Sequence, residues 1–205
     1  NTTSLYDPAT NTFAAGPTFA VNVNTGAFAF AINSGTQAGK TRIVLGNGNN
    51  TALFDPNGFP TPIAVGSTLS GTAGAGAHAF SITTGSEAGK QMFVHGGNSN
   101  STSVYDPATD SFGIGPSLSA NAGAGANSFL IEAGTHNGKQ FVVLGNNNPA
   151  ASSTSFYDPS LNTFSTGTLL TGATNTGGYS FRLNAVTSGR LPLVRTLTGQ
   201  DLKMV

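Results

Sequence analysis

The chain lacks cysteine and tryptophan, and charged residues make up only 8% of its 205 positions. Without cysteine it can form no disulfide, use no thiolate nucleophile and ligate no metal through sulfur. Eight Lys and Arg residues balance eight Asp and Glu residues, so the formal net charge is zero. A chain with so little positive charge cannot neutralise a phosphate backbone, and we therefore expect no nucleic-acid partner.

Long hydrophobic runs are also missing. No stretch approaches the ~18 consecutive apolar residues that indicate a transmembrane helix, so we expect no membrane insertion. Apolar residues still make up 38% of the chain, enough for a buried core. The polar surface must come from Asn, Thr, Ser and Gly, a composition that we associate with exported proteins. It predicts an extracellular or cell-surface location.

A Tyr-Asp-Pro segment recurs four times, as "TSLYDPATNTF", "TALFDPNGFP", "TSVYDPATDSF" and "TSFYDPSLNTF". Its aromatic residues Tyr6, Phe54, Tyr105 and Tyr157 are 48, 51 and 52 residues apart. Two further patterns keep the same phase. One is an Ala- and Gly-rich run that ends in an aromatic residue, as in "GAGAHAFSI", and the other is a Gly-Lys turn before an apolar run, as in "AGKTRIVLG". The chain is therefore a repeat with a period near fifty.

Each repeat contains four strand-like runs separated by turn-forming residues. We name them strands a to d: a is the Ala/Gly/Phe run, b the β-branched run, c the run into the Tyr-Asp-Pro corner and d the run after it. Strand a includes Ala27, Phe28 and Phe30, strand b includes Ile43, Val44 and Leu45, and strand d starts at Phe13, Phe112 and Phe164.

The corner between strands c and d has a structural explanation. An Asp side chain caps such a turn, and the Pro after it presets the backbone and ends the strand's hydrogen bonding. We therefore expect structural roles for the corner residues, which are Asp7, Pro8, Asp55, Pro56, Asp106, Pro107, Asp158 and Pro159.

Four short antiparallel strands in ~50 residues are typical of a β-propeller blade. The sequence resembles kelch repeats, in which an apolar strand runs into glycine, a variable polar loop follows and a "YDPxTxxF" corner ends the unit. Two features depart from that pattern: only Gly96-Gly97 keeps a double glycine, and Phe13, Phe112 and Phe164 stand where kelch repeats usually carry Trp. The resemblance implies an all-β propeller of about four kelch-like blades, each a four-stranded antiparallel sheet.

We expect one propeller unit over residues 1–205. Its repeats run approximately over 1–25 (partial), 26–70, 71–120, 121–172 and 173–205 (partial). Three arrangements stay open: a closed four-bladed ring in which the C-terminal strands a and b join the N-terminal c and d, a piece of a longer propeller, or blades completed between subunits.

Residues suited to catalysis are few and scattered. His78, His95 and His136 are expected on strand a, at the end of strand b and in the a–b turn, which are three different heights in a blade. Glu87 and Glu132 do not form a paired-carboxylate pattern. Copper oxidases of the kelch type use a cysteine cross-link, which this chain cannot form. We expect no catalytic residue, no metal and no cofactor.

Three Asn-x-Ser/Thr triplets lie five residues before the corner aromatics and make Asn1, Asn49 and Asn100 candidate N-glycan attachment sites. The alternative is that loops rich in Asn, Ser and Thr produce such triplets by chance.

The b–c loops "GNGNN", "GGNSNS" and "GNNNPAASS" offer hydrogen bonds and no charge. They predict a non-catalytic binding or structural module for neutral partners, either a polysaccharide or a protein surface. One alternative is a filament or layer subunit that assembles with copies of itself by strand exchange. Another is a carbohydrate-active enzyme, for which Glu132 and His95 would be the residues to test.

Overall fold

The computed structural model describes residues 2–58, 63–146, 152–176, 178 and 180. Within these residues the protein is all-β, with fourteen strands and a single 3-10 turn at Pro56–Gly58. The strands form antiparallel sheets of the repeated blade type, which confirms the predicted fold class.

Three sheets are complete four-stranded blades whose strands pair in chain order, so that strand a is followed by b, c and d. Blade 1 consists of β3 (Phe28–Ala31), β4 (Thr41–Val44), β5 (Thr51–Phe54) and β6 (Ala64–Val65). Blade 2 consists of β7 (His78–Ser81), β8 (Gln91–Val94), β9 (Thr102–Asp106) and β10 (Ser111–Ile114). Blade 3 consists of β11 (Asn127–Leu130), β12 (Gln140–Val143), β13 (Thr154–Asp158) and β14 (Thr163–Thr166).

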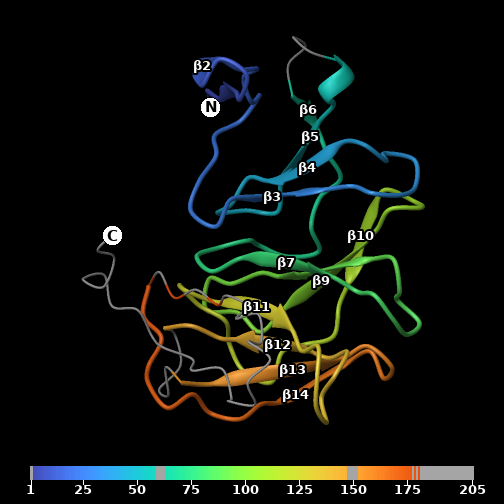
Figure 1. Ribbon diagram of the computed structural model, residues 1–205, viewed down its shortest axis with the longest axis vertical. Helices are drawn as coiled ribbons and strands as arrows, with labels where there is room; N and C mark the ends of the chain where they lie inside the picture. The colour runs from blue at the N-terminus through green and yellow to red at the C-terminus, as the bar shows by residue number, and fades with distance from the viewer. Residues whose placement is uncertain (1, 59–62, 147–151, 177, 179, 181–205) are drawn as a thin grey trace.

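The fourth sheet is a two-stranded unit, β1 (Ser4–Asp7) with β2 (Thr12–Ala15), which we call the half-blade. Its strands correspond to c and d of a complete blade. The half-blade lies beside blade 1, at the opposite end of the long axis from blade 3 (Figure 1). The chain that leaves it is joined to blade 1 by a hydrogen bond from Ile63 N to Thr18 O of 3.3 Å.

The d strands begin one residue before the aromatics from which we predicted them, because c and d pair right up to the corner. Thr12 pairs with Asp7, and Ser111 pairs with Asp106. Blade 1 differs, since a 3-10 turn follows its corner and β6 has only two residues. The predicted repeat 173–205 lies largely outside the described residues.

Hydrophobic clusters between neighbouring blades form the core. Strand a of one blade places a phenylalanine against the strand c tyrosine of the next: the ring centroids of Phe30 and Tyr105 are 5.6 Å apart, and those of Phe80 and Tyr157 are 5.7 Å apart. The first pair is edge-to-face and the second is tilted, and aromatic pairs at such distances add to the free energy gained by burying the rings. The blades are therefore held together face to face by a contact that repeats with the sequence.

A second contact between blades involves the turn from strand a to strand b. Gly35 and Gly85 both have left-handed backbones, with φ of 77° and 82°. A Cβ atom on Gly35 would collide with Pro107 O of the next blade, and one on Gly85 would collide with Pro159 O. Glycine is required at these positions because each a–b turn rests on the corner proline of the following blade.

Candidate functional site

The charged side chains gather at one end of the blades. Each one in the described part of the chain belongs to an a–b turn, a c–d corner or, for Arg42, the start of a strand b. In a four-stranded antiparallel sheet the a–b and c–d connections share one end, and the b–c loops lie at the other. We call these the charged end and the loop end. The charged residues are Asp7, Lys40, Arg42, Asp55, Glu87, Lys90, Asp106, Asp110, Glu132, Lys139 and Asp158.

The repeated lysine of the a–b turn pairs with the corner aspartate of its own blade. The Nζ–Oδ2 distances are 3.3 Å for Lys40–Asp55, 3.1 Å for Lys90–Asp106 and 2.8 Å for Lys139–Asp158. Lys90 also lies 2.9 Å from Glu87, and its hydrogen bonds to these two carboxylates raise the pKa of its ammonium group. The Gly-Lys turn therefore ties strands a and b to the corner of strands c and d.

The corner aspartates also cap their own turns. Asp106 Oδ1 accepts a hydrogen bond from Ala108 N at 2.9 Å, which is the main reason that its carboxyl pKa is lowered. Hydrogen bonds from Lys139 and then Ser160 lower the pKa of Asp158 to about 2. The equivalent backbone bonds run from Ala9 N to Asp7, from Asn57 N to Asp55 and from Ser160 N to Asp158, at 2.9, 2.9 and 3.0 Å. All four corners therefore have the geometry of an Asx turn.

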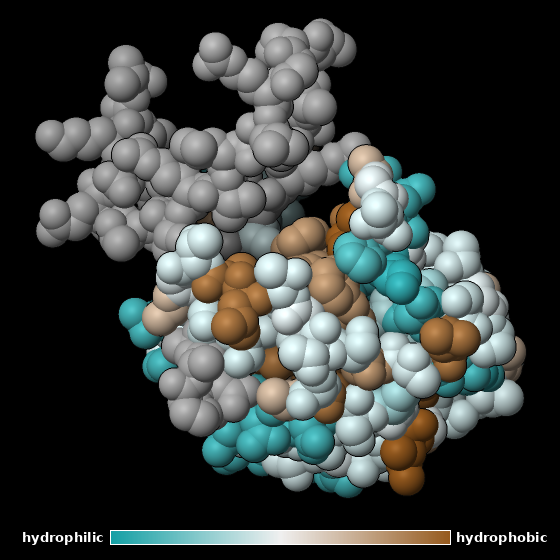
Figure 2. Space-filling view, turned by 90° about the horizontal axis from the view of Figure 1, so that it is seen from below, coloured by the Kyte–Doolittle hydropathy of each residue, from teal (hydrophilic) through white to brown (hydrophobic). Residues whose placement is uncertain are grey.

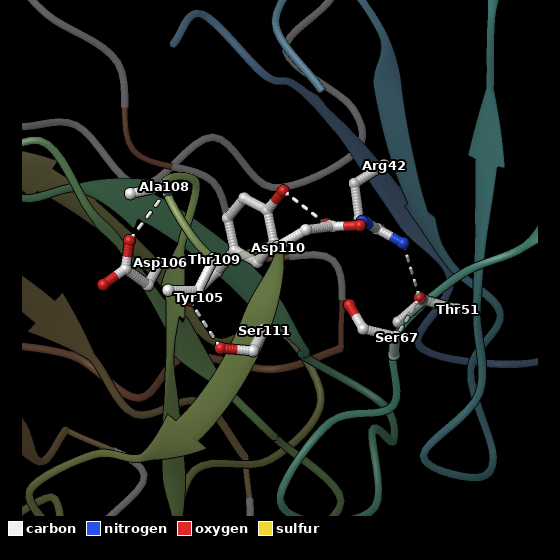
Figure 3. Close-up of polar contacts among 9 residues, drawn as sticks. All are labelled: Arg42, Thr51, Ser67, Tyr105, Asp106, Ala108, Thr109, Asp110 and Ser111. Carbon is white, nitrogen blue, oxygen red and sulfur yellow. Dashed lines mark hydrogen bonds and ion pairs between the residues drawn. The ribbon is translucent and has the colours of Figure 1, made fainter. Parts of the chain in front are cut away.

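An ion pair between a buried arginine and a partly exposed aspartate, which we did not predict from the sequence, links blades 1 and 2 (Figure 3). Arg42 on β4 has a relative exposure of 0%, and its guanidinium donates to Asp110 Oδ1 in the corner of blade 2. Tyr105 Oη donates to the same oxygen at 2.8 Å, and its ring lies 5.5 Å from the guanidinium carbon. Arg42 also donates to Thr51 Oγ1 at 3.4 Å. The group is a lock between two blades.

The sequence did contain a signal for this lock. Asp110 has φ of 53°, and its counterparts Asn11 and Asn162 have φ of 54° and 51° and accept from the corner tyrosines in the same way. Only in blade 2 is this left-handed residue an aspartate. Arg42 is the only charged residue within a strand b among the described residues.

The histidines do not come together. His95 is 2% exposed, and its Nε2 lies 2.6 Å from Ser103 Oγ, which in turn lies 2.6 Å from Ser70 Oγ. Burial lowers the pKa of His95. This resembles a serine–histidine pair, but Ser103 is fully buried, so no substrate can reach its hydroxyl.

His78 and His136 are each held locally. His78 Nδ1 lies 2.9 Å from Gly76 O, and burial lowers the pKa of its imidazole. The ring of His136 stacks on Phe156 at 4.7 Å. In the described part of the chain, no group of three or more His, Asp or Glu residues is arranged to hold a metal ion.

The two glutamates belong to the a–b turns of different blades, Glu87 in blade 2 and Glu132 in blade 3. An open cleft of about 330 Å3 lies between blades 1 and 2 at the charged end. Its one charged lining residue is Lys90, which the two carboxylates already neutralise. The cleft is therefore lined by no acid–base pair that could catalyse a reaction.

The glycosylation triplets have a structural component. Asn49 and Asn100 are exposed on b–c loops, whereas Thr51 and Thr102 are 1% and 2% exposed. Thr102 Oγ1 donates to Pro116 O at 2.7 Å, and Thr154, whose repeat has no such Asn, makes the same bond to Thr168 O at 2.7 Å. The fold therefore accounts for the threonine of each triplet without glycosylation. Asn1 lies outside the described residues.

The loop end is uncharged in the described residues. Its b–c loops are polar, whereas Val23 and Leu169, in the connections that follow strands d, are 40% and 61% exposed there. Left-handed backbones at Asn47 (φ 46°) and Asn98 (φ 65°) shape its b–c loops, and Asn100 and Ser101 are exposed beside them. In the described residues this end carries no charged side chain and no exposed aromatic ring.

Comparison with known proteins gives no family: no family model matches the chain, and no curated protein matches it significantly. The fold defines the class, an all-β repeat protein of the propeller type. In the part of the chain that the structure describes, no helix is both long and apolar enough to cross a membrane.

Proposed function

We propose that this chain is a non-catalytic, kelch-like propeller module, displayed outside the cell, that binds a neutral polysaccharide through its loop end. The observation that carries the proposal is the separation of charge. The described charged side chains all lie at the opposite end. At that end the three lysines form ion pairs within their own blades, and Arg42 forms an ion pair between blades.

The uncharged, polar b–c loops suit a hydroxyl-rich ligand, because no ion loses its hydration when the ligand binds. The amides of Asn98 and Asn100 can both donate to and accept from hydroxyl groups. Protein interfaces are instead enriched in aromatic residues, Met and Arg at their centres. The loop end exposes none of these in its described residues, which favours a polysaccharide over a protein partner.

The chemistry of the remaining side chains supports a role without catalysis. The closest approach to a nucleophile–base pair, Ser103 with His95, is buried. Its serine also has a counterpart in blade 3, where Ser155 Oγ accepts from Ser119 N at 3.3 Å. A position that serves the backbone in two blades is better explained by packing than by turnover.

Retention on insoluble cellulose, chitin and starch tests the proposal. We expect the wild-type chain to bind at least one of these matrices. The double variant Asn98→Asp/Asn100→Asp should bind at least tenfold more weakly, because it places charge on the loop end. The matched control Asn57→Asp adds charge at an exposed corner of the charged end and should bind like the wild type. No retention of the wild type, or equal loss in the control, would contradict the proposal.

A second candidate function is self-assembly, which one specific observation favours. Tyr6 and Phe13 of the half-blade are 51% and 73% exposed, whereas the equivalent Tyr105 in a complete blade is fully buried. The half-blade thus presents the apolar surface with which other blades pack.

A further inference from the structure

Blade 3 has an aromatic face that no other blade among the described residues covers. Phe129 is 42% exposed, although its counterpart Phe80 in blade 2 is 8% exposed against Tyr157 of the next blade. Phe141 is partly exposed, whereas the equivalent Arg42 and Met92 are fully buried against the following blade. This surface is therefore equivalent to the one with which blades 1 and 2 each pack against the following blade.

The rings on this face form a continuous ladder. The centroid distances are 5.1 Å for Phe129–Phe141, 4.9 Å for Phe141–Phe156 and 4.7 Å for His136–Phe156. Figure 2 views the molecule from the blade 3 end of Figure 1 and shows brown apolar groups among the polar surface. We call this surface the aromatic face, defined by Phe129, His136, Phe141 and Phe156.

The half-blade has the complementary shape. Its Tyr6 and Phe13 rings are 5.2 Å apart and tilted by 46°. The equivalent pairs that dock on a preceding blade are both 5.0 Å apart and tilted by 44° and 45°. These pairs are Tyr105 with Phe112 and Tyr157 with Phe164. The half-blade thus carries a docking surface that is already formed.

The glycine of the a–b turn in blade 3 lacks the contact that its counterparts in blades 1 and 2 make with the following blade, among the described residues. Gly134 of blade 3 has φ of 79°, like Gly35 and Gly85, but no described atom lies within 4 Å of a Cβ built there. Gly35 and Gly85 each rest on a corner proline of the next blade. Pro8, in the corner of the half-blade, is the equivalent proline.

The half-blade of the same chain is placed elsewhere, beside blade 1 and far from blade 3 (Figure 1). Phe19, just after the half-blade, is buried with Ile63 of the blade 1 region. We propose that the aromatic face of blade 3 binds the half-blade of a second copy of this chain, with Tyr6 on Phe129 and Pro8 on Gly134.

Such a contact joins two different surfaces, so it produces either closed rings of subunits or filaments. The proposal goes beyond polysaccharide binding and does not depend on it, because the loop end takes no part in the contact. Loss of retention on the matrices would leave this contact intact, and loss of the contact would leave a monomer that still presents its loop end.

Cysteine cross-linking tests the contact directly, because the chain has no cysteine of its own. Ala9 and Thr135 are exposed, and their counterparts Ala108 and Thr36 lie at the blade 1–blade 2 contact, where Thr36 N donates to Pro107 O at 3.2 Å. Mixing Ala9→Cys with Thr135→Cys chains under mild oxidation should give a disulfide-linked heterodimer. Mixing Ala9→Cys with Asn98→Cys, at the loop end, should give only background.

A chain that carries both Ala9→Cys and Thr135→Cys distinguishes binding of a second copy's half-blade from binding of the chain's own half-blade. A ladder of dimers and higher species on a non-reducing gel supports binding of a second copy. A monomer cross-linked within itself would overturn the proposal, because the half-blade would then bind the aromatic face of its own chain. Absence of any specific cross-link would overturn it as well.

Light scattering across a concentration series gives an independent measurement. Phe129→Asp and Tyr6→Asp should each weaken association at least tenfold, because both place a charge in the contact. Ile114→Asp changes a residue that is 88% exposed on the outer strand of blade 2, and this control should associate like the wild type. A wild type that stays monomeric at all concentrations, or equal effects of all three variants, would contradict the contact.

Discussion

The complete blades and the half-blade have nearly the same corner sequence but very different environments. "YDPATDSF" in blade 2 and "YDPATNTF" in the half-blade form the same two strands and the same Asx turn. Yet Tyr105 is 0% exposed and Tyr6 is 51% exposed. Local sequence builds the hairpin, and a neighbouring blade provides the burial that stabilises it.

The largest expected difference is between the two tyrosines. We expect Tyr105→Ala to lower the free energy of unfolding by about 4 kcal/mol, because it opens a cavity between blades 1 and 2. Tyr6→Ala should cost less than about 0.5 kcal/mol in dilute solution. Urea denaturation at low protein concentration measures both, and equal losses would show that the half-blade is as well packed as a complete blade.

The Arg42–Asp110 ion pair distinguishes the interface between blades 1 and 2 from the interface between blades 2 and 3. Asp110→Asn should lower the free energy of unfolding by about 3 kcal/mol, because it leaves the Arg42 guanidinium buried without a counter-charge. Adding Arg42→Met should recover most of this loss. The double variant copies the second interface, where Met92 and Asn162 occupy the equivalent positions. A double variant no more stable than Asp110→Asn would show that the pair is not coupled.

The strand c threonine offers a smaller comparison. Thr154→Val removes a buried donor to Thr168 O and should cost about 1 to 2 kcal/mol. Thr3 Oγ1 donates to Pro17 O at 2.6 Å, but Thr3 is only partly buried, and Thr3→Val should cost less than half as much. Thermal unfolding of the two variants beside the wild type is the measurement, and a larger effect at Thr3 would contradict the expected order.

Acid titration gives the smallest effect. The pKa of Asp158 falls from 3.8 to about 2 on folding, so its contribution to stability is complete above about pH 4 and is lost as the pH falls toward 2. Asp158→Asn should therefore flatten the decline of stability over this range. Asp7→Asn should change it less, because the described residues give Asp7 no lysine partner. Unfolding midpoints between pH 5 and pH 2 would show whether the slopes differ in this order.

Much of the fold could be predicted because its signals are local. The Asp-Pro turns, the alternation of strands and the glycine turns each depend on residues close in the sequence, and their recurrence every ~50 residues identified the blade. The Arg42–Asp110 pair was not predicted: each member departs visibly from its repeat, but they are 68 positions apart, and the sequence does not show that the two meet. The sequence indicated a structural role for the corner aspartates, because an Asp-Pro turn is a local pattern. It did not indicate that the lysines of the a–b turns pair with these aspartates.

The sequence by itself determined the repeat, the four strands of each blade and the corners between them, since these depend on backbone preferences within a few residues. Only the tertiary structure decided that the lysines meet the corner aspartates, that charge lies at one end, and that Phe129 and Tyr6 are left uncovered while Phe80 and Tyr157 meet. Contacts between blades depend on which sheet lies beside which. The sequence of one repeat does not determine which other sheet packs against it. The same local pattern therefore gives a buried residue in one repeat and an exposed one in another.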